Sequence, residues 1–240
     1  MLVKLSICTL TVFSVILAFS KNEYCGILCN NVNHTMCTYH GVSNACSPYG
    51  KFGVKDDQKT FIVDLHNRLR NRVASGRERR GLSGPQPQAS NMKKLIWDDD
   101  VAEVAQRWAD QCRKGHDQCR NDRRFGVGQS VFWTRKTRCH EAEWEHAIRS
   151  WYREVRNLPL STLRSYKKTD VGHYTQLVWA NTEVIGCGYR TRNRPRGCET
   201  FYVCNYGRGG NMKTQKVYQI GPPRFACRNS PVDPKYPALC

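Results

Sequence analysis

The segment that decides the fold is GHYTQLVW, residues 172–179, which is followed further along the chain by FYVCNYGRGGNM, residues 201–212. After His173, large apolar residues alternate with polar ones, a pattern that predicts a half-buried strand over residues 174–180. His173 stands at the start of this strand, directly behind a glycine. An imidazole at such a place can act as a catalyst, bind a metal or pack as a hydrogen-bonded ring, so the rest of the sequence has to separate these roles.

Helix and strand signals fall in two blocks. Apolar residues recur at helical spacing over residues 56–76, 97–112 and 140–155, and the first of these helices has Asp56 or Asp57 as its N-cap and Gly76 as its stop. Two more strands are predicted over residues 185–191 (IGCGYRT) and 199–206 (ETFYVCNY). Helices followed by strands predict an α+β domain with a mostly antiparallel sheet of about three strands.

The first 20 residues have the layout of a cleavable secretory signal, with Lys4, an apolar run and the small-residue end Ala18-Phe19-Ser20. The apolar run is too short to span a bilayer. We therefore expect a secreted, extracellular protein. Its predicted parts are the signal peptide (1–20), a cysteine-rich extension (21–55), a main domain (56–220) and a short cysteine-stapled tail (221–240).

Cysteine usage agrees with export. Of the 13 cysteines, Cys8 lies in the signal; the other twelve are an even number, which is typical of up to six disulfides formed in an oxidising compartment. The alternative, a zinc–thiolate site, lacks a paired Cys-x-x-Cys framework. The sequon at Asn33 (Asn-His-Thr) predicts a surface glycan.

The chain is strongly basic. Its formal net charge is +18, and removal of the signal, which carries one lysine and no acid, leaves +17. In YRTRNRPRG an arginine occupies every second position, which on an extended chain lines one face with guanidinium groups; these are Arg190, Arg192, Arg194 and Arg196. We expect this row to bind sulfate, phosphate or carboxylate groups. The alternative is a basic surface that only keeps the protein soluble.

Four sequence patterns occur in order along the chain: HNRLR (66–70), VGQSVF (127–132), GHYTQLVW (172–179) and FYVCNYGRGGNM (201–212). Together they resemble the signatures of the CAP superfamily (SCP/TAPS) of secreted cysteine-rich proteins. Within it, the sequence is similar to the insect antigen 5 proteins, the venom and salivary allergen group, over roughly Tyr24–Tyr218. The resemblance implies an α-β-α sandwich that is delivered in venom or saliva and acts outside the cell.

The resemblance also implies a cleft surrounded by two histidines and two acidic residues. The matching positions are His116, Gln129, Glu154 and His173, so an amide replaces one acid. His116, Glu154 and His173 are a sufficient ligand set for Zn²⁺, with Gln129 as a weak ligand or as a hydrogen-bond partner behind the ligands. The alternatives are hydrogen-bonded structural rings for the histidines and a surface acid at a helix end for Glu154.

Catalysis is not expected. The sequence has no Gly-x-Ser-x-Gly elbow and no His-Glu-x-x-His helix, and the cysteines after the signal are expected in disulfides. No cofactor is required, and a divalent metal such as zinc is the one candidate. His173 is therefore expected to line a cleft, as a ligand or a structural ring.

The antigen 5 resemblance implies the disulfides Cys25–Cys37, Cys29–Cys119, Cys46–Cys112 and Cys187–Cys204. The four remaining cysteines allow three pairings, of which we favour Cys139–Cys198 with Cys227–Cys240.

The charge and the resemblance point to different partners. A sulfated glycosaminoglycan or an anionic membrane suits a basic secreted protein, whereas no nucleic-acid-binding module occurs. CAP proteins also offer apolar grooves for sterols, fatty acids or eicosanoids, and Trp144, Ile148 and Trp151 would either border such a groove or belong to the core. We expect a monomer, with the tail as a further candidate contact.

Overall fold

A four-stranded sheet with the order β3-β5-β6-β4 lies at the centre of the protein. The computed structural model describes residues 21–46 and 49–240, so the predicted signal peptide lies outside the described residues. The strands are β3 (Ile96–Trp97), β4 (Val127–Lys136), β5 (Val184–Arg194) and β6 (Gly197–Gly207). β5 and β6 form an antiparallel hairpin, β4 is antiparallel to β6, and the short β3 is parallel to β5. The predicted mostly antiparallel sheet is confirmed, with one strand more than expected.

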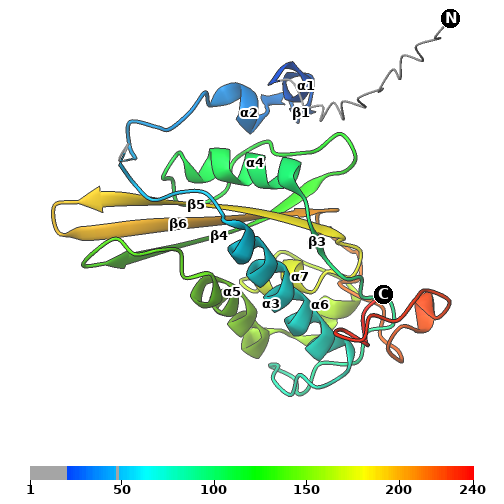
Figure 1. Ribbon diagram of the computed structural model, residues 1–240. Helices are drawn as coiled ribbons and strands as arrows, with labels where there is room; N and C mark the ends of the chain where they lie inside the picture. The colour runs from blue at the N-terminus through cyan, green and yellow to red at the C-terminus, as the bar shows by residue number, and fades with distance from the viewer. Residues whose placement is uncertain (1–20, 47–48) are drawn as a thin grey trace, which may run out of the picture.

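Helices cover both faces of the sheet and give the expected α-β-α sandwich (Figure 1). One face carries α4 (Asp99–Ala109). The other carries α3 (Asp56–Ala74), α5 (Trp144–Arg153), α6 (Leu160–Arg164) and α7 (Gly172–Leu177), with the 3₁₀ helix η1 (Glu154–Asn157). The cysteine-rich extension lies outside α4 and contains α1 (Lys21–Cys25), β1 (Leu28–Cys29), β2 (Val32–Asn33) and α2 (Thr35–Thr38); the tail contains η2 (Phe225–Cys227). Within the described residues, no helix is long and apolar enough to cross a membrane.

The strand predicted over residues 174–180 is wrong, because these residues form α7 and the turn after it. All residues from Tyr174 to Ala180 are buried. A short helix that is buried on every side does not show helical spacing of its apolar residues, so the local alternation was misleading. The missing third strand is β4, whose outer half carries the polar residues Thr134, Arg135 and Lys136 and gave no strand signal.

The three predicted helices are confirmed with shorter bounds. Lys55, rather than an aspartate, is the N-cap of α3, and Asp56 and Asp57 lie in its first turn. Gly76 follows the helix with φ +71°, a left-handed conformation that favours glycine. α5 begins only at Trp144, and Trp144, Ile148 and Trp151 all belong to the main core between the sheet and the helices.

α4 packs directly on β5 because two glycines of that strand leave room for its backbone. A Cβ atom on Gly186 would lie 2.2 Å from the backbone nitrogen of Ala102, and one on Gly188 would lie 2.4 Å from the Cα atom of Gln106. Between these glycines, Cys187 is joined to Cys204 of β6. The close contact between α4 and the hairpin is therefore fixed by the IGCG sequence.

The described residues form six disulfides, which are the six pairs expected. Two of them, Cys29–Cys119 and Cys46–Cys112, join the cysteine-rich extension to the main domain. The others are Cys25–Cys37 in the extension, Cys139–Cys198 and Cys187–Cys204 at the sheet, and Cys227–Cys240 in the tail. Such a set is typical of a protein that folds in an oxidising compartment.

Arg70 of α3 is a fully buried cation at the junction of the helices and the connecting loops. Its guanidinium donates to the backbone carbonyl oxygens of Lys93, Leu177, Trp179, Ala180 and Thr182, at 2.6 to 3.4 Å. No carboxylate of the described residues forms an ion pair with it, and burial lowers the pKa of Arg70 to about 9. The charge is therefore neutralised only by carbonyl dipoles.

Replacing Arg70 with Met should lower the free energy of unfolding by about 3–5 kcal/mol, because it leaves several buried carbonyl groups without donors. Denaturant unfolding with the disulfides intact measures this. The control, Arg77→Met on the exposed surface, should stay within about 0.5 kcal/mol of the wild type. A change below about 1 kcal/mol for Arg70→Met would show that the carbonyl groups find other partners.

Candidate functional site

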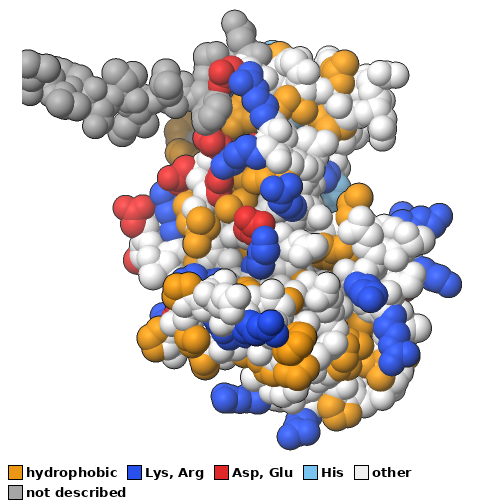
Figure 2. Space-filling model, turned by 90° about the vertical axis from the view of Figure 1, so that its right-hand side faces the viewer, with side chains coloured by type: hydrophobic (Ala, Val, Ile, Leu, Met, Phe, Trp, Pro, Cys, Tyr) orange, Lys and Arg blue, Asp and Glu red, His pale blue; other side chains and the backbone are white. Residues whose placement is uncertain are grey.

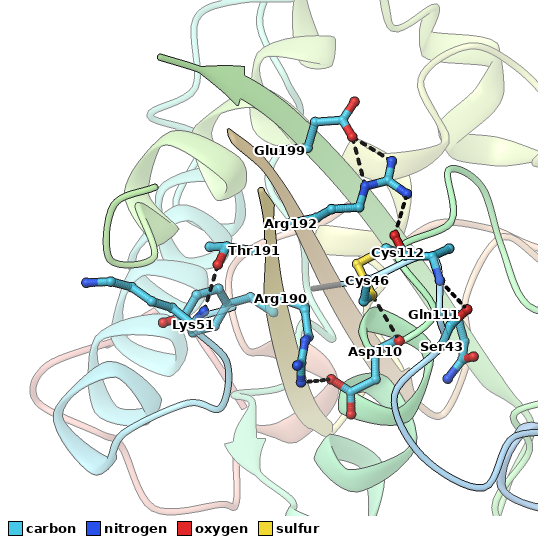
Figure 3. Close-up of a disulfide and its surroundings, with 12 residues drawn as sticks. Ser43, Cys46, Lys51, Asp110, Gln111, Cys112, Arg190, Thr191, Arg192 and Glu199 are labelled. Carbon is cyan, nitrogen blue, oxygen red and sulfur yellow. Dashed lines mark hydrogen bonds and ion pairs between the residues drawn. A yellow bond between two sulfur atoms is a disulfide. The ribbon is translucent and has the colours of Figure 1, made fainter. Parts of the chain in front are cut away.

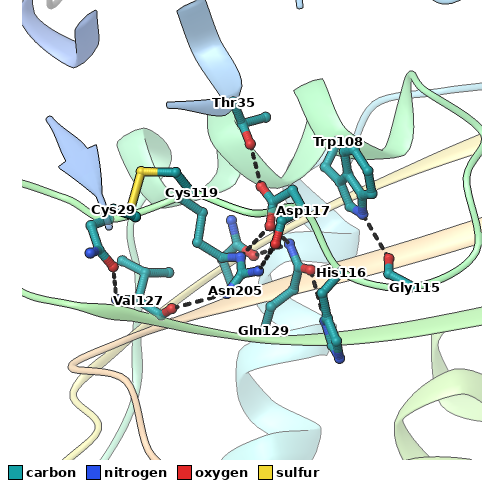
Figure 4. Close-up of polar contacts among 12 residues, drawn as sticks. Cys29, Thr35, Trp108, Gly115, His116, Asp117, Cys119, Val127, Gln129 and Asn205 are labelled. Atoms are coloured by element: carbon teal, nitrogen blue, oxygen red, sulfur yellow. Dashed lines mark hydrogen bonds and ion pairs between the residues drawn. A yellow bond between two sulfur atoms is a disulfide. The ribbon is translucent and has the colours of Figure 1, made fainter. Parts of the chain in front are cut away.

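His116 and Gln129 form one side of the predicted cleft. His116 lies in the loop after α4, and its Nδ1 is 2.9 Å from Oε1 of Gln129 on β4 (Figure 4). The Nε2 group of Gln129 donates to Asp117 Oδ1 and Asn205 Oδ1, both at 3.0 Å. Because the amide oxygen can only accept, His116 Nδ1 carries the proton and Nε2 of the ring keeps its lone pair.

His173 and Glu154 form the other side. Glu154, the first residue of η1, accepts from His173 Nδ1 at 2.6 Å and from the backbone N–H groups of His173 and Tyr174 at 3.0 Å. The His173 ring also stacks on Trp151, with ring centroids 6.2 Å apart. The carboxylate therefore caps α7 and fixes His173 in the same tautomer as His116.

Both rings line one hollow with a volume of about 400 Å³. Its wall also contains Gln129, Tyr166, Lys168, Thr169, Asp170, Gly172 and Asn211. The structure thus brings together His116, Gln129 and His173, and it places Glu154 behind His173. Reduced hydration lowers the pKa of His116, so this ring is neutral near pH 7.

The predicted ligand set of His116, Glu154 and His173 is not assembled as such. Both oxygen atoms of Glu154 already accept hydrogen bonds from His173 or from the backbone beside it. Within the described part of the chain, no three His, Cys, Asp or Glu side chains are grouped so that they could hold a metal ion. The two imidazoles that line the hollow, His116 and His173, are the residues that could reach a divalent cation there, and a metal at this site stays a prediction.

The side chains around Gln129 explain why this position holds an amide and not an acid. Asp117 is 5% exposed and receives hydrogen bonds from Thr35 Oγ1 at 2.5 Å and from Arg120. A carboxylate at position 129 would lie beside that of Asp117, whereas the amide supplies the donor that both Asp117 and Asn205 need. The amide is thus the residue type that this site requires.

The predicted arginine row is wrong as a solvent-facing surface (Figure 3). Arg190 is 2% exposed and forms an ion pair with Asp110 at 3.2 Å. Arg192 is 9% exposed and donates to Glu199 and to the carbonyl oxygen of Ala45. Arg194 also pairs with Glu199, at 3.1 Å. Of the four arginines, only Arg194 and Arg196 are exposed to solvent. The alternating pattern was right for a strand, but the extension and the end of α4 cover this face.

Asn33 is exposed on β2, so its side chain is accessible for a glycan, and glycosylation there stays a prediction.

Comparison with known proteins decides the family. Residues 63–206 match the family model described as CAP, the cysteine-rich secretory protein family. The chain belongs to this family. It is 42% identical over 221 residues to a venom allergen 3 homolog of Dinoponera quadriceps, covering 88% of this chain and 96% of that protein. It is also 42% identical over 203 residues to venom allergen 5 of Dolichovespula arenaria, covering 82% and 99%.

Solved CAP structures have the same fold. The crystal structure of NaASP2 with Zn²⁺ matches with a TM-score of 0.67 at 29% identity, covering 81% of this chain and 99% of that one. BmVAL-1 matches with a TM-score of 0.65 at 29% identity, covering 80% and 97%. The chain is thus a venom allergen-like CAP protein in both sequence and fold.

Sequence reasoning missed two residues of this CAP cleft, Asp117 and Asn205. Asp117 directly follows His116, and Asn205 lies within the FYVCNYGRGGNM motif, so both adjoin sequence features that already point to the cleft. What showed their role is the position of Gln129 between them, which requires the pairing of β4 with β6.

Replacing Gln129 with Glu should destabilise the protein by about 2–4 kcal/mol at pH 7, because two carboxylates would share one buried site. One of them would have a raised pKa in the folded state. A carboxyl pKa that is higher in the folded state lowers the free energy of unfolding, and this loss is complete above the folded-state pKa. The loss disappears once the pH falls below the pKa of the unfolded state, near 4. The deficit should therefore shrink from about pH 7 to about pH 4.

Unfolding free energies measured across this pH range check the prediction. Gln118→Glu is the control, because Gln118 is exposed in the same loop. A deficit for Gln129→Glu that does not depend on pH would contradict the carboxylate pairing.

Proposed function

We propose that this protein is secreted in venom or saliva and acts there as a non-enzymatic CAP protein that binds an anionic partner through a basic surface. The predicted signal peptide, the six disulfides and the venom allergens among its relatives support the setting. The engagement of Glu154 and the amide at position 129 argue for binding over catalysis.

Many of the basic side chains are not free to bind a partner, because a carboxylate already pairs with them. Arg80 lies 2.7 Å from Glu78, Arg124 lies 2.8 Å from Asp98, and Arg192 lies 2.5 Å from Glu199. Paired charges attract an additional anion weakly. The surface that matters is therefore the one where cations have no acidic neighbours.

One such surface is formed by two segments that contain no Asp or Glu, residues 155–169 and 208–232. They lie side by side: the N–H of Tyr166 donates to Gln215 O at 2.8 Å, and the N–H of Val217 donates to Leu163 O at 2.9 Å. We call their exposed surface the acid-free face. Six of its exposed cations are central to the argument, namely Arg164, Lys167, Lys168, Lys213, Lys216 and Arg228.

None of these six cations forms an ion pair with a carboxylate of the described residues. In Figure 2, which views the molecule from the side of α6 and the tail, blue and orange side chains predominate over the lower half and red ones gather higher up. Asp170 marks the edge of the acid-free face, at the hollow between His116 and His173. Six unpaired cations on one face are the observation that carries the proposed function.

We expect a heparin oligosaccharide to bind the protein at low ionic strength and to lose affinity as salt is added. The triple variant Lys167→Ser, Lys213→Ser, Lys216→Ser should bind at least about tenfold more weakly. The control is Lys51→Ser, Lys93→Ser, Lys136→Ser, which removes the same charge from lysines that pair with Glu141, Glu183 and Glu143. Equal losses in the two variants would mean that only net charge matters; no binding at low salt would refute the proposal.

A second candidate function is the carriage of small lipids such as fatty acids, eicosanoids or sterols. A groove of about 540 Å³ lies between α3 and α5, with Leu65, Leu69 and Tyr152 in its wall. Its rim consists of arginines, namely Arg68, Arg72, Arg80, Arg149 and Arg153. An apolar wall beneath guanidinium groups suits a carboxylate with a hydrocarbon tail.

Glu78 partly neutralises the positive charge of the arginines around this groove. It is fully buried and accepts from Arg72, from Arg80 and from Tyr152 Oη at 2.8 Å. Burial alone would raise its pKa, but the hydrogen bonds from Arg80 prevail and lower the pKa of Glu78 to about 2. Arg149 and Arg153 do not contact Glu78, but Arg149 forms an ion pair with Glu145 at 2.7 Å. Arg153 donates to Ser150 Oγ and has no carboxylate partner among the described residues, so it is the main cation left for a ligand, with Arg149 beside it.

If the groove holds fatty acids, Arg149→Ser with Arg153→Ser should weaken the binding of palmitate about tenfold. Displacement of a fluorescent fatty acid measures the affinity. Arg135→Ser with Arg138→Ser, at and just beyond the C-terminal end of β4, is the control of equal charge. Tight binding that both variants retain would place the lipid elsewhere.

A further inference from the structure

The acid-free face also exposes large apolar side chains among its cations. Met212 is 51% exposed, Ile220 46% and Phe225 60%. Ile220 and Phe225 line a hollow of about 620 Å³ together with Tyr218 and Pro222, and Arg164 and Lys216 stand in its wall. Apolar and cationic groups therefore occupy the same surface.

The tail holds Phe225 outward by burying its neighbour. Arg224 is 8% exposed, adopts a left-handed conformation with φ +61°, and donates to the carbonyl oxygen atoms of Leu239 and Ser230. The Cys227–Cys240 disulfide closes this segment. The usual arrangement is thus inverted, with a charged residue inside and the adjacent phenylalanine in solvent. Arg228 lies over the exposed Phe225 ring, 5.5 Å from its centroid.

A large phenylalanine that a stapled tail presents to water marks a contact surface. A second copy of this chain does not fit, because it would bring six cations against six. A sulfated glycan would use the cations but would leave Ile220 and Phe225 without a role. A bilayer with anionic headgroups uses both, since cations reach phosphate groups while apolar side chains enter the acyl boundary.

We propose that the acid-free face docks on an anionic phospholipid membrane, with Phe225 and Ile220 at the headgroup–acyl boundary and the six cations at the headgroup phosphates. This inference rests on the proposed function and selects one partner for it. In this proposal Arg224 fixes the tail segment through its hydrogen bonds to Leu239 and Ser230, and it does not contact lipid.

The test is co-sedimentation of the full-length mature protein with vesicles of phosphatidylcholine, with and without phosphatidylserine. The wild type should bind the vesicles that contain phosphatidylserine. Ile220→Ser with Phe225→Ser, which leaves the charge unchanged, should weaken this binding at least about tenfold while heparin binding stays the same. Leu28→Ser with Val42→Ser removes exposed apolar side chains of the cysteine-rich extension and is the matched control. Unchanged thermal unfolding would show that each variant is folded.

Each outcome separates the two proposals. Heparin binding without vesicle binding would overturn the membrane inference and leave the proposed function standing. Vesicle binding that Ile220→Ser with Phe225→Ser does not weaken would also overturn it, because attraction would then be electrostatic alone. Absence of both heparin and vesicle binding at low salt would overturn both. Vesicle binding that falls in this variant, and not in the control variant, would support the inference.

Discussion

The buried guanidinium of Arg70 is the constraint on which the arrangement of the helices depends. It has no carboxylate partner among the described residues and instead donates to carbonyl oxygens of residue 93 and of the segment 177–182. Two of these carbonyls, those of Leu177 and Trp179, belong to the end of α7 and the turn after it. At the other end of α7, Glu154 accepts from the N–H groups of His173 and Tyr174. This six-residue helix thus has an anion at its N-terminus and a cation at its C-terminus, which is the arrangement that the helix dipole favours. His173 is held directly by Glu154, and Arg70 fixes the other end of the same helix.

The cleft and the cysteine-rich extension form one polar network. Thr35 of α2 donates to Asp117, Asp117 accepts from Gln129, and Gln129 accepts from His116. The Cys29–Cys119 disulfide fixes the same region covalently. A residue of the extension therefore acts through two hydrogen-bonded side chains on the orientation of a cleft imidazole. Gln129 is part of this coupling, because its amide nitrogen donates to both Asp117 and Asn205.

The sequence was sufficient for the class of fold, the helices and the disulfide pairs, and insufficient for features that depend on tertiary contacts. The helices at 56–76 and 97–112 have strong apolar spacing, and four of the six cysteine pairs followed from the antigen 5 resemblance. The pairs Cys139–Cys198 and Cys227–Cys240 were one choice among three pairings, and the structure confirms it. α7 was misjudged because its stability comes from Arg70 and Glu154, which are distant in sequence, and not from local spacing. The prediction for the arginine row was wrong for the same reason. Alternation located the strand correctly, but it could not show that Asp110 and Glu199 pair with the buried arginines Arg190 and Arg192.

The acid-free face is only half visible in the sequence. The sequence shows a long interval without acidic residues between Glu199 and Asp233. The hydrogen bond between residues 166 and 215 is needed to show that a second such interval lies beside the first.

The position of β4 has a consequence for how copies of the protein meet. β4 is the last strand of the sheet, and its outer side has no neighbouring strand among the described residues. An open strand edge is a template on which identical chains can stack into aggregates. Here Trp151 Nε1 donates to the carbonyl oxygen of Val131, and the strand ends in Arg135 and Lys136. The carbonyl oxygen of Val131 already accepts from the indole, and the charged side chains of Arg135 and Lys136 would lose hydration if a second strand paired with this edge. The open edge of the sheet is thus protected against stacking between copies of the protein.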